Sequence, residues 1–309
     1  MALQIQCQSL TKRFQGIKAL DGFDLELDIT QPTGIVGPNG AGKSTLFSIL
    51  CGFIRPTAGK VRILGSAPDS GLNKGKISLL PQDTAMFKGI DVFSQLKHYA
   101  RLQNFSSHDA KKEVERVLSL VQATSFAKQF PETLSFGQRK RVILAQSLIG
   151  TPELILMDEP TSGLDPVAAT EVRRILQQLG NEHSVVISSH NLNELEDICS
   201  DIAIMNKGKL ISHTSLSELT RSSQCFTLRL ENPGDNQLSE LLKDINEISK
   251  IESDKNDMKS YFIYYEGDRA EQIQIKILSK LHEHTIAVSE LKKGKALADE
   301  ISEILKSNN

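Results

Sequence analysis

The sequence predicts an α/β protein: a core of buried, mainly parallel strands that alternate with helices, followed by a smaller α+β domain. Three short apolar runs, at residues 35–36, 154–157 and 185–187, contain no polar side chain. Parallel strands that are buried on both faces have this composition, whereas half-exposed strands alternate. Helical patterns lie between the runs, which is typical of α/β folds. From about residue 220 the pattern changes, and this change predicts the second domain.

Each element of the larger part follows from its own pattern. Apolar and polar residues alternate at positions 25–29, which predicts a half-buried strand near the N-terminus. Amphipathic or mostly apolar helical patterns then occur at four places. The last of them begins just after Pro166, a residue favoured in the first turn of a helix. The four expected helices cover residues 44–50, 111–121, 137–149 and 167–179.

The C-terminal part predicts a small ferredoxin-like unit, because its expected order is strand, helix, strand, strand, helix and strand, with one further helix. We therefore predict two domains, residues 1–220 and 222–309. His282 and His284 have no acid or cysteine cluster beside them, so we expect no metal site there and assign this domain to dimerisation or regulation. Its elements are expected at residues 226–230, 237–248, near 251, 261–265, 269–282, 286–291 and 296–305.

Composition excludes some classes of function. The formal net charge of −2 gives no bulk attraction to nucleic acid or to an anionic membrane, so we expect no nucleic-acid partner. The four cysteines are isolated in sequence, which favours a reducing compartment over a disulfide framework. The first residues do not resemble a signal peptide, and no apolar run is long enough to span a bilayer. We expect a cytoplasmic protein that reaches a membrane only through a partner.

A glycine-rich segment after the first apolar run matches the P-loop template G-x-x-x-x-G-K-[ST] in full. Glycines let the backbone curl so that its N–H groups point at phosphate oxygens, and the following helix adds its dipole. Lys43 is expected to reach the β- and γ-phosphates of ATP, and the Ser44 hydroxyl to bind Mg²⁺. The alternative, a glycine-rich turn without a ligand, fits the strand–loop–helix context less well. The predicted nucleotide-binding residues here are Gly37, Pro38, Asn39, Gly40, Ala41, Gly42, Lys43, Ser44 and Thr45.

Two acidic residues follow the second apolar run directly. Open α/β sheets bind ligands at the carboxyl ends of their strands, so Asp158 is expected to hold Mg²⁺ and Glu159 to polarise the attacking water as a general base. Two solvated loop acids are the alternative, which the nearby P-loop disfavours. His190 ends the third run, and its position alone is equally compatible with a γ-phosphate contact and with an ordinary polar side chain.

The segment Leu134-Ser135-Phe136-Gly137-Gln138 resembles the signature motif of ABC ATPases. Other motifs agree over residues 3–215: Gln82 resembles the Q-loop glutamine, residues 162–165 the D-loop, His190 the switch histidine, and Phe14 the aromatic residue that stacks on adenine. The resemblance implies a P-loop ABC ATPase domain with a mixed, mainly parallel core sheet, an antiparallel β subdomain and a helical subdomain. The catalytic residues that it implies are Glu159, His190, Gln82 and Lys43, and the metal ligands are Ser44, Gln82 and Asp158.

The same resemblance implies how two ATP molecules are held. Two such domains pair head to tail, and each ATP lies on the P-loop of one copy and under Ser135, Gly137 and Gln138 of the other. The usual second glycine of the motif is Phe136 here, and we expect this change to shift or weaken the contact, because Phe cannot adopt every backbone geometry of Gly.

Within the family, residues 80–103 and the added C-terminal domain resemble the ATPase subunits of two-component, ABC-2-type exporters. This resemblance implies an integral membrane permease as a separate chain, pairing as a homodimer or with a second ATPase subunit, and a peripheral position on the cytoplasmic face of the cell membrane. Residues 83–99 are then expected to contact the permease, although an ordinary surface helix would have the same pattern.

Two other functions fit less well. Non-transport ABC ATPases usually join two cassettes in one chain or insert a long coiled coil, whereas this chain has one P-loop and no long heptad repeat. An ATP-binding regulatory module with slow turnover is supported only by Phe136. An active ATPase is favoured instead by the intact Lys43, Gln82, Asp158, Glu159 and His190.

Overall fold

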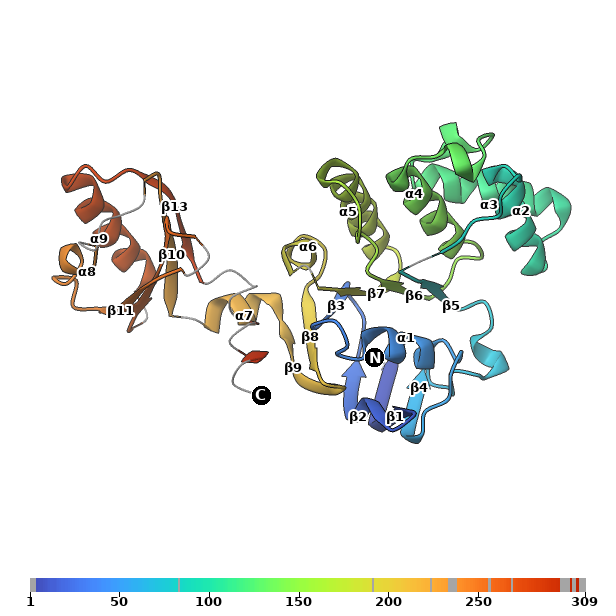
Figure 1. The fold of residues 1–309 in the computed structure, drawn as a ribbon, viewed down its shortest axis with the longest axis horizontal. Helices are drawn as coiled ribbons and strands as arrows, with labels where there is room; N and C mark the ends of the chain where they lie inside the picture. Colours follow the sequence, from blue (N-terminus) through green and yellow to red (C-terminus); the bar gives the residue numbers. More distant parts are fainter. Residues whose placement is uncertain are drawn as a thin grey trace. The chain divides into compact units, whose positions relative to one another are not determined.

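A computed structural model describes residues 4–82, 84–190, 192–222, 224–232, 238–254, 257–267, 269–294, 301 and 304–305 (Figure 1). The chain divides into two compact units, residues 1–213 and 214–309. The predicted domain bounds, residues 1–220 and 222–309, stay a prediction. Within the described residues, none of the helices combines the length and the apolar character that crossing a membrane requires.

The core of the first unit is a six-stranded sheet in the order β5-β6-β7-β3-β8-β9. The pairs from β5 to β8 are parallel, and β8 is joined to β9 by Lys207 and Gly208, both with positive φ, as in a tight hairpin. All residues of β3 and β6 are buried, which confirms the prediction from the apolar runs. The strands are β3 (Thr33–Val36), β5 (Ile77–Leu80), β6 (Leu154–Asp158), β7 (Ser184–Ser189), β8 (Asp201–Asn206) and β9 (Lys209–Ser215).

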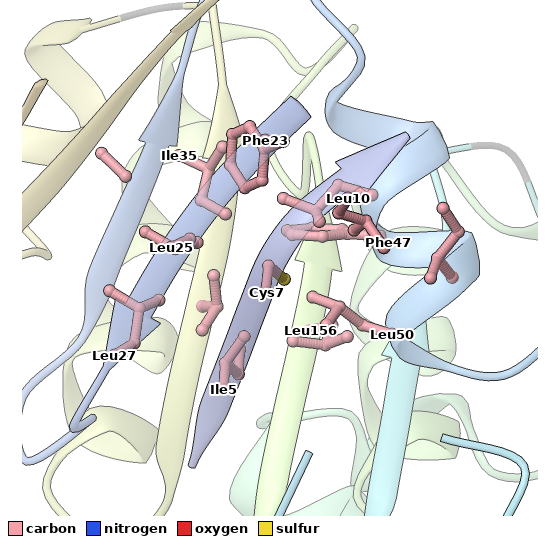
Figure 2. Close-up of a cluster of buried hydrophobic side chains, with 14 of the residues drawn as sticks. Ile5, Cys7, Leu10, Phe23, Leu25, Leu27, Ile35, Phe47, Leu50 and Leu156 are labelled. Carbon is pink, nitrogen blue, oxygen red and sulfur yellow. The ribbon is translucent and has the colours of Figure 1, made fainter. Parts of the chain in front are cut away.

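A second sheet of three antiparallel strands, in the order β2-β1-β4, contributes to the same core. Its strands are β1 (Ile5–Phe14), β2 (Ile17–Leu27) and β4 (Ala58–Ile63), and the alternation predicted at 25–29 falls at the end of β2. Helix α1 (Lys43–Leu50) packs between the two sheets (Figure 2). Burial raises the pKa of the Cys7 thiol, in the middle of this core, to about 12, so Cys7 acts as an apolar side chain.

Of the remaining helices of the first unit, α4 contacts β5 of the parallel sheet, and α5 and α6 contact β7 (Figure 1). Helices α2, α3 and α4 pack on one another, and α4 also contacts β5 and α5. The predicted helices are confirmed, although α3 begins before the expected residue 111 because the Ser106 hydroxyl accepts a hydrogen bond from the Asp109 N–H and caps it. Their bounds are α2 (Val92–Leu102), α3 (Ser107–Leu120), α4 (Phe136–Ser147), α5 (Pro166–Gly180) and α6 (Leu192–Glu196), with short 3₁₀ turns at Gly71–Asn73, Thr124–Phe126 and Pro131–Thr133.

The second unit has the predicted βαββαβ order. Its antiparallel sheet runs β11-β12-β10-β13, and α9 packs Ile273, Ile277 and Leu281, one turn apart, into the core beneath it. The helix expected over 237–248 is wrong in length, because among the described residues of this range only Leu238–Leu241 (α8) are helical. The helix expected over 296–305 lies largely outside the described residues. The elements are α7 (Leu216–Ser222), β10 (Cys225–Leu230), α8, β11 (Ile248–Ser253), β12 (Ser260–Tyr265), α9 (Ala270–Glu283) and β13 (Val288–Lys293).

Candidate active site

The loop between β3 and α1 can be built only with glycine at two of its positions. A Cβ on Gly37 would lie 2.3 Å from the Met205 carbonyl oxygen, and one on Gly42 would lie 2.5 Å from the Ala19 carbonyl oxygen. Gly42, with a φ of 106°, is the N-cap of α1, and among the described residues no side chain caps this helix. At these two glycines the loop packs against the backbone of Met205 and Ala19. It leads into the start of α1, where unpaired N–H groups attract anions.

Lys43 lies inside this loop rather than in solvent. Its ammonium donates to the carbonyl oxygens of Gly37 at 2.7 Å and Pro38 at 3.3 Å, and it lies 3.9 Å from the Glu159 carboxylate. Burial lowers the pKa of Lys43, while the negative charges of Glu159 and Asp158 act in the opposite direction. The next residue, Ser44, is exposed, and Thr45 is partly exposed.

The Glu159 carboxylate is the point at which the predicted catalytic side chains meet. It is buried just beyond the end of β6. The side-chain amide of Gln82 donates to it at 3.2 Å, and the His190 Nδ1 lies 3.0 Å away. With Lys43, three of the predicted residues therefore gather around the Glu159 carboxylate, although the four residues come from four separate segments of the chain.

The backbone of Glu159 is held in an unusual conformation. Its φ is +48°, in the left-handed region that non-glycine residues rarely adopt. Its N–H lies 3.1 Å from both the carbonyl and the hydroxyl oxygen of Ser188, and the Ser188 hydroxyl donates to the Asp158 carboxylate. On the other side, the Lys140 ammonium donates to the Glu159 carbonyl oxygen at 3.4 Å. Such conformations cost about 1–3 kcal/mol and persist where neighbouring groups hold them.

Sequence reasoning missed both Ser188 and Lys140. Ser188 precedes His190 at the end of β7, and it lies beside Asp158 only through the pairing of β7 with β6, which the sequence does not show. Lys140 follows the signature segment within a basic stretch of α4, and it is buried whereas the neighbouring Arg139 is exposed.

The signature residues form a separate group at the start of α4. Ser135 is the N-cap: its hydroxyl accepts from the Gln138 N–H at 3.3 Å, and its own N–H donates to the Gln138 side chain at 2.9 Å. A Cβ on Gly137 would lie 2.8 Å from the Ala168 Cβ, so glycine is needed here for the contact between α4 and α5.

Phe136 fits this helix start without a glycine-like backbone. It is the first residue of α4, and it is not among the residues with positive φ. Its ring lies 3.2 Å from the place where a Cβ on Gly163 would be. We expected Phe136 to weaken the contact with a second copy because Phe cannot adopt every backbone geometry of Gly. In this structure the backbone at Phe136 needs no such geometry.

Phe14, the residue predicted to stack on adenine, lies on the antiparallel sheet and not on the segments that meet at Glu159. It ends β1, is 45% exposed, and has the Lys12 ammonium 5.0 Å from its ring centroid, a cation–π distance. An exposed ring can stack on a base, and its contact with adenine stays a prediction.

The fold and the side chains around the Glu159 carboxylate define a P-loop ATPase. Comparisons with known proteins show which class of ATPase it is. A family model described as ABC transporter matches residues 20–162. The ABC transporter ATP-binding protein YhaQ of Bacillus subtilis is 33% identical over 69% of this chain and 72% of its own. The probable sulfate/thiosulfate import protein CysA of Chlorella vulgaris is 33% identical over 71% and 94%, and the linearmycin resistance protein LnrL of B. subtilis is 30% identical over 70% of each. The chain belongs to the family of ABC transporter ATP-binding proteins, which are ATPases.

Solved structures agree on the fold. CbiO1 from Clostridium perfringens, part of the ABC transporter complex CbiONQ, superposes with a TM-score of 0.65 at 26% identity, over 71% of this chain and 91% of that chain. MJ0796, a bacterial ABC transporter cassette solved as a dimer, gives 0.63 at 25% identity, over 69% and 98%. These matches confirm the predicted ABC ATPase fold.

Proposed function

We propose that this chain is the ATPase subunit that powers export through a separate membrane permease, and that Glu159 is its general base. The observation that carries the catalytic part is the convergence of Gln82, His190 and Lys43 on the Glu159 carboxylate. A carboxylate fixed by such neighbours can polarise a water molecule, and His190 or Gln82 can orient that water or the γ-phosphate.

The residues around Glu159 also fit ATP and Mg²⁺. Mg²⁺ prefers oxygen ligands, which the Ser44 hydroxyl, the Asp158 carboxylate and the Gln82 amide oxygen offer at the edge of the loop. The loop leads into the start of α1, which no described side chain caps, so its N–H groups suit phosphates. When bound, Mg²⁺ would neutralise charge on the β- and γ-phosphates.

We further propose that two copies share each nucleotide. The start of α4, with Ser135, Gly137 and Gln138, points N–H groups and a helix dipole toward solvent, where the γ-phosphate on a second copy can complete the site. Closure then depends on that phosphate, so hydrolysis would open the pair. The dimeric state of the similar MJ0796 cassette supports this arrangement.

The export direction rests on subtype resemblance and on one relative. LnrL is named for resistance to linearmycin, and export is one way to resist a toxic compound. The proposed contact with the permease is the segment 83–99, which includes the half-exposed Phe87 and the start of α2; residue 83 lies outside the described residues. Import is the second candidate, because the similar CysA is named as an import protein.

The catalytic proposal is tested with Glu159→Gln. We expect ATP binding to be kept and hydrolysis to slow by about 10²- to 10⁴-fold, the usual contribution of a general base. Glu153→Gln is the matched control, since Glu153 precedes the other end of β6 and pairs with Lys76 near solvent. Near-normal turnover of Glu159→Gln would reject Glu159 as the base.

The transport proposal is tested by purifying tagged Glu159→Gln protein from gently solubilised membranes of its native host. We expect a multi-spanning membrane protein at a fixed ratio to the bait. Reconstitution of that membrane protein into vesicles with the unchanged ATPase chain would then separate export from import by the direction of ATP-driven movement. A bait that stays soluble, or that brings down ribosomes or DNA-repair factors, would reject the transport assignment and leave the ATPase assignment standing.

A further inference from the structure

Lys140 is a buried cation that reaches the active site from α4. Only 5% of its surface is exposed, while Arg139 beside it is exposed and Arg141 is partly buried. The Lys140 Nζ donates to the Gln82 carbonyl oxygen at 3.2 Å and to the Glu159 carbonyl oxygen at 3.4 Å. One ammonium group therefore joins the two chain segments that carry the amide and the carboxylate of the site.

These two segments are neighbours in the parallel sheet. Leu80 of β5 pairs with Met157 of β6, and Gln82 and Glu159 each follow shortly after these residues. Lys140 thus bonds across the carboxyl ends of two adjacent strands, from a helix that packs on β5. An ammonium has three donors and no fixed plane, so it can serve two carbonyl oxygens at once. A buried charge is costly unless it has such partners, so the ammonium of Lys140 depends on these two carbonyl oxygens.

The bond to the Glu159 carbonyl bears on the left-handed conformation of that residue. Ser188 holds the N–H side of Glu159, and on the carbonyl side Lys140 adds a second donor to the Ser162 N–H, which donates to the same oxygen at 3.2 Å. Loss of one of these bonds would let Glu159 relax toward an ordinary backbone conformation. Its carboxylate would then turn away from Gln82 and His190, without any change in the residues that carry out the chemistry.

We infer that Lys140 is a positioning residue that fixes Glu159 and Gln82 and links both to the signature helix. The same helix begins at Ser135, the residue proposed to face the nucleotide of a second copy. A shift of α4 on closure would therefore move the Lys140 ammonium and, through it, the Glu159 backbone. This inference rests on the proposed function, because Glu159 must be the base for its position to matter.

The first experiment compares variants of the full chain in steady-state ATP hydrolysis. Lys140→Met should lower kcat by about 10- to 100-fold, since a small misplacement of a catalytic group has effects of this size, and leave KM for ATP within about threefold. Lys140→Arg, which keeps a buried donor cation, should recover most of the loss. Arg116→Met is the control: Arg116 on α3 also donates to a backbone carbonyl, that of Leu148 at 2.9 Å, so its loss should lower the melting temperature but leave kcat unchanged.

The second experiment asks whether Lys140 acts through Glu159. In a Glu159→Gln background, adding Lys140→Met should cause little further loss of kcat, because residues that act as a unit are not additive. Full additivity, or a Lys140→Met kcat within about threefold of the unchanged protein, would overturn the inference. If Lys140→Met does not fold, Lys140→Gln against Lys140→Arg replaces it, and equal kcat values for these two would overturn it as well. Failure of the proposed function is distinct, because Glu159→Gln alone would then hydrolyse ATP normally.

Discussion

Two helix starts in the first unit carry the predicted nucleotide contacts, and they are built in opposite ways. Helix α1 begins at Gly42, and among the described residues no side chain caps it. Helix α4 begins at Ser135, where the side chains of Ser135 and Gln138 each bond the backbone of the other. The first start has a buried lysine inside its loop, whereas at the second, exposed start two backbone N–H groups bond to its own side chains.

This difference matches the two partners that each start is proposed to meet. The α1 start would hold the phosphates of its own nucleotide, and its N–H groups, which no described side chain caps, are available for them. The α4 start would meet a nucleotide only when a second copy arrives. Until then its N-terminal N–H groups face water, and a capping box stabilises the helix in the unpaired chain.

The largest effect is expected from removal of the positive charge of Lys43, at the start of α1. Lys43→Ala should weaken ATP binding by about 10³-fold, because charge-assisted bonds to phosphate are among the strongest hydrogen bonds. Lys43→Met keeps the buried stem, and an equal loss in that variant would assign the effect to the charge. Equilibrium binding of a fluorescent ATP analogue measures both, and tight binding by either variant would contradict the role given to the α1 start.

An intermediate effect is expected from a charge at the α4 start. Ser135→Asp keeps a good N-cap but places a carboxylate where the γ-phosphate of a second copy would approach, so ATP hydrolysis should fall by about 10²-fold through like-charge repulsion. Ser135→Asn keeps the cap without the charge and should stay within about threefold of the unchanged protein. Binding of ATP to the single chain should be the same in both variants. Equal hydrolysis by the Asp and Asn variants would show that no phosphate comes near Ser135.

The smallest effect concerns the packing that sets the α4 start in place. Gly137→Ala brings two Cβ atoms to 2.8 Å at Ala168, and such overpacking costs about 1–3 kcal/mol. Ala168→Gly removes the opposing Cβ, so the double variant should be less destabilised than the sum of the two single variants. Thermal unfolding measures all three. Simple additivity would mean that the contact between α4 and α5 does not require glycine.

The two helix starts also differ in how far the sequence predicts them. The P-loop template predicts both the loop and the need for glycine, and the apolar run before Asp158 predicts where Glu159 lies, because these features are local. The sequence motif marks Ser135 and Gly137 but not why Gly137 is small, since Ala168 lies on another helix. Lys140 and Ser188 were missed for the same reason: their bonds join segments far apart in the chain, and no spacing rule connects them. The length of α8 was overestimated because we identified no local signal in the sequence that ends the helix at Leu241.

The most direct test of the shared site mixes two inactive variants. Lys43→Ala spoils the α1 start and Ser135→Asp spoils the α4 start, so each alone should hydrolyse ATP very slowly. In a mixed pair, the intact Lys43 of one copy meets the intact Ser135 of the other, which rebuilds one complete site. We predict that the mixture hydrolyses ATP well above the sum of the two variants measured separately. Activity no greater than that sum would contradict a site built from both helix starts of two copies.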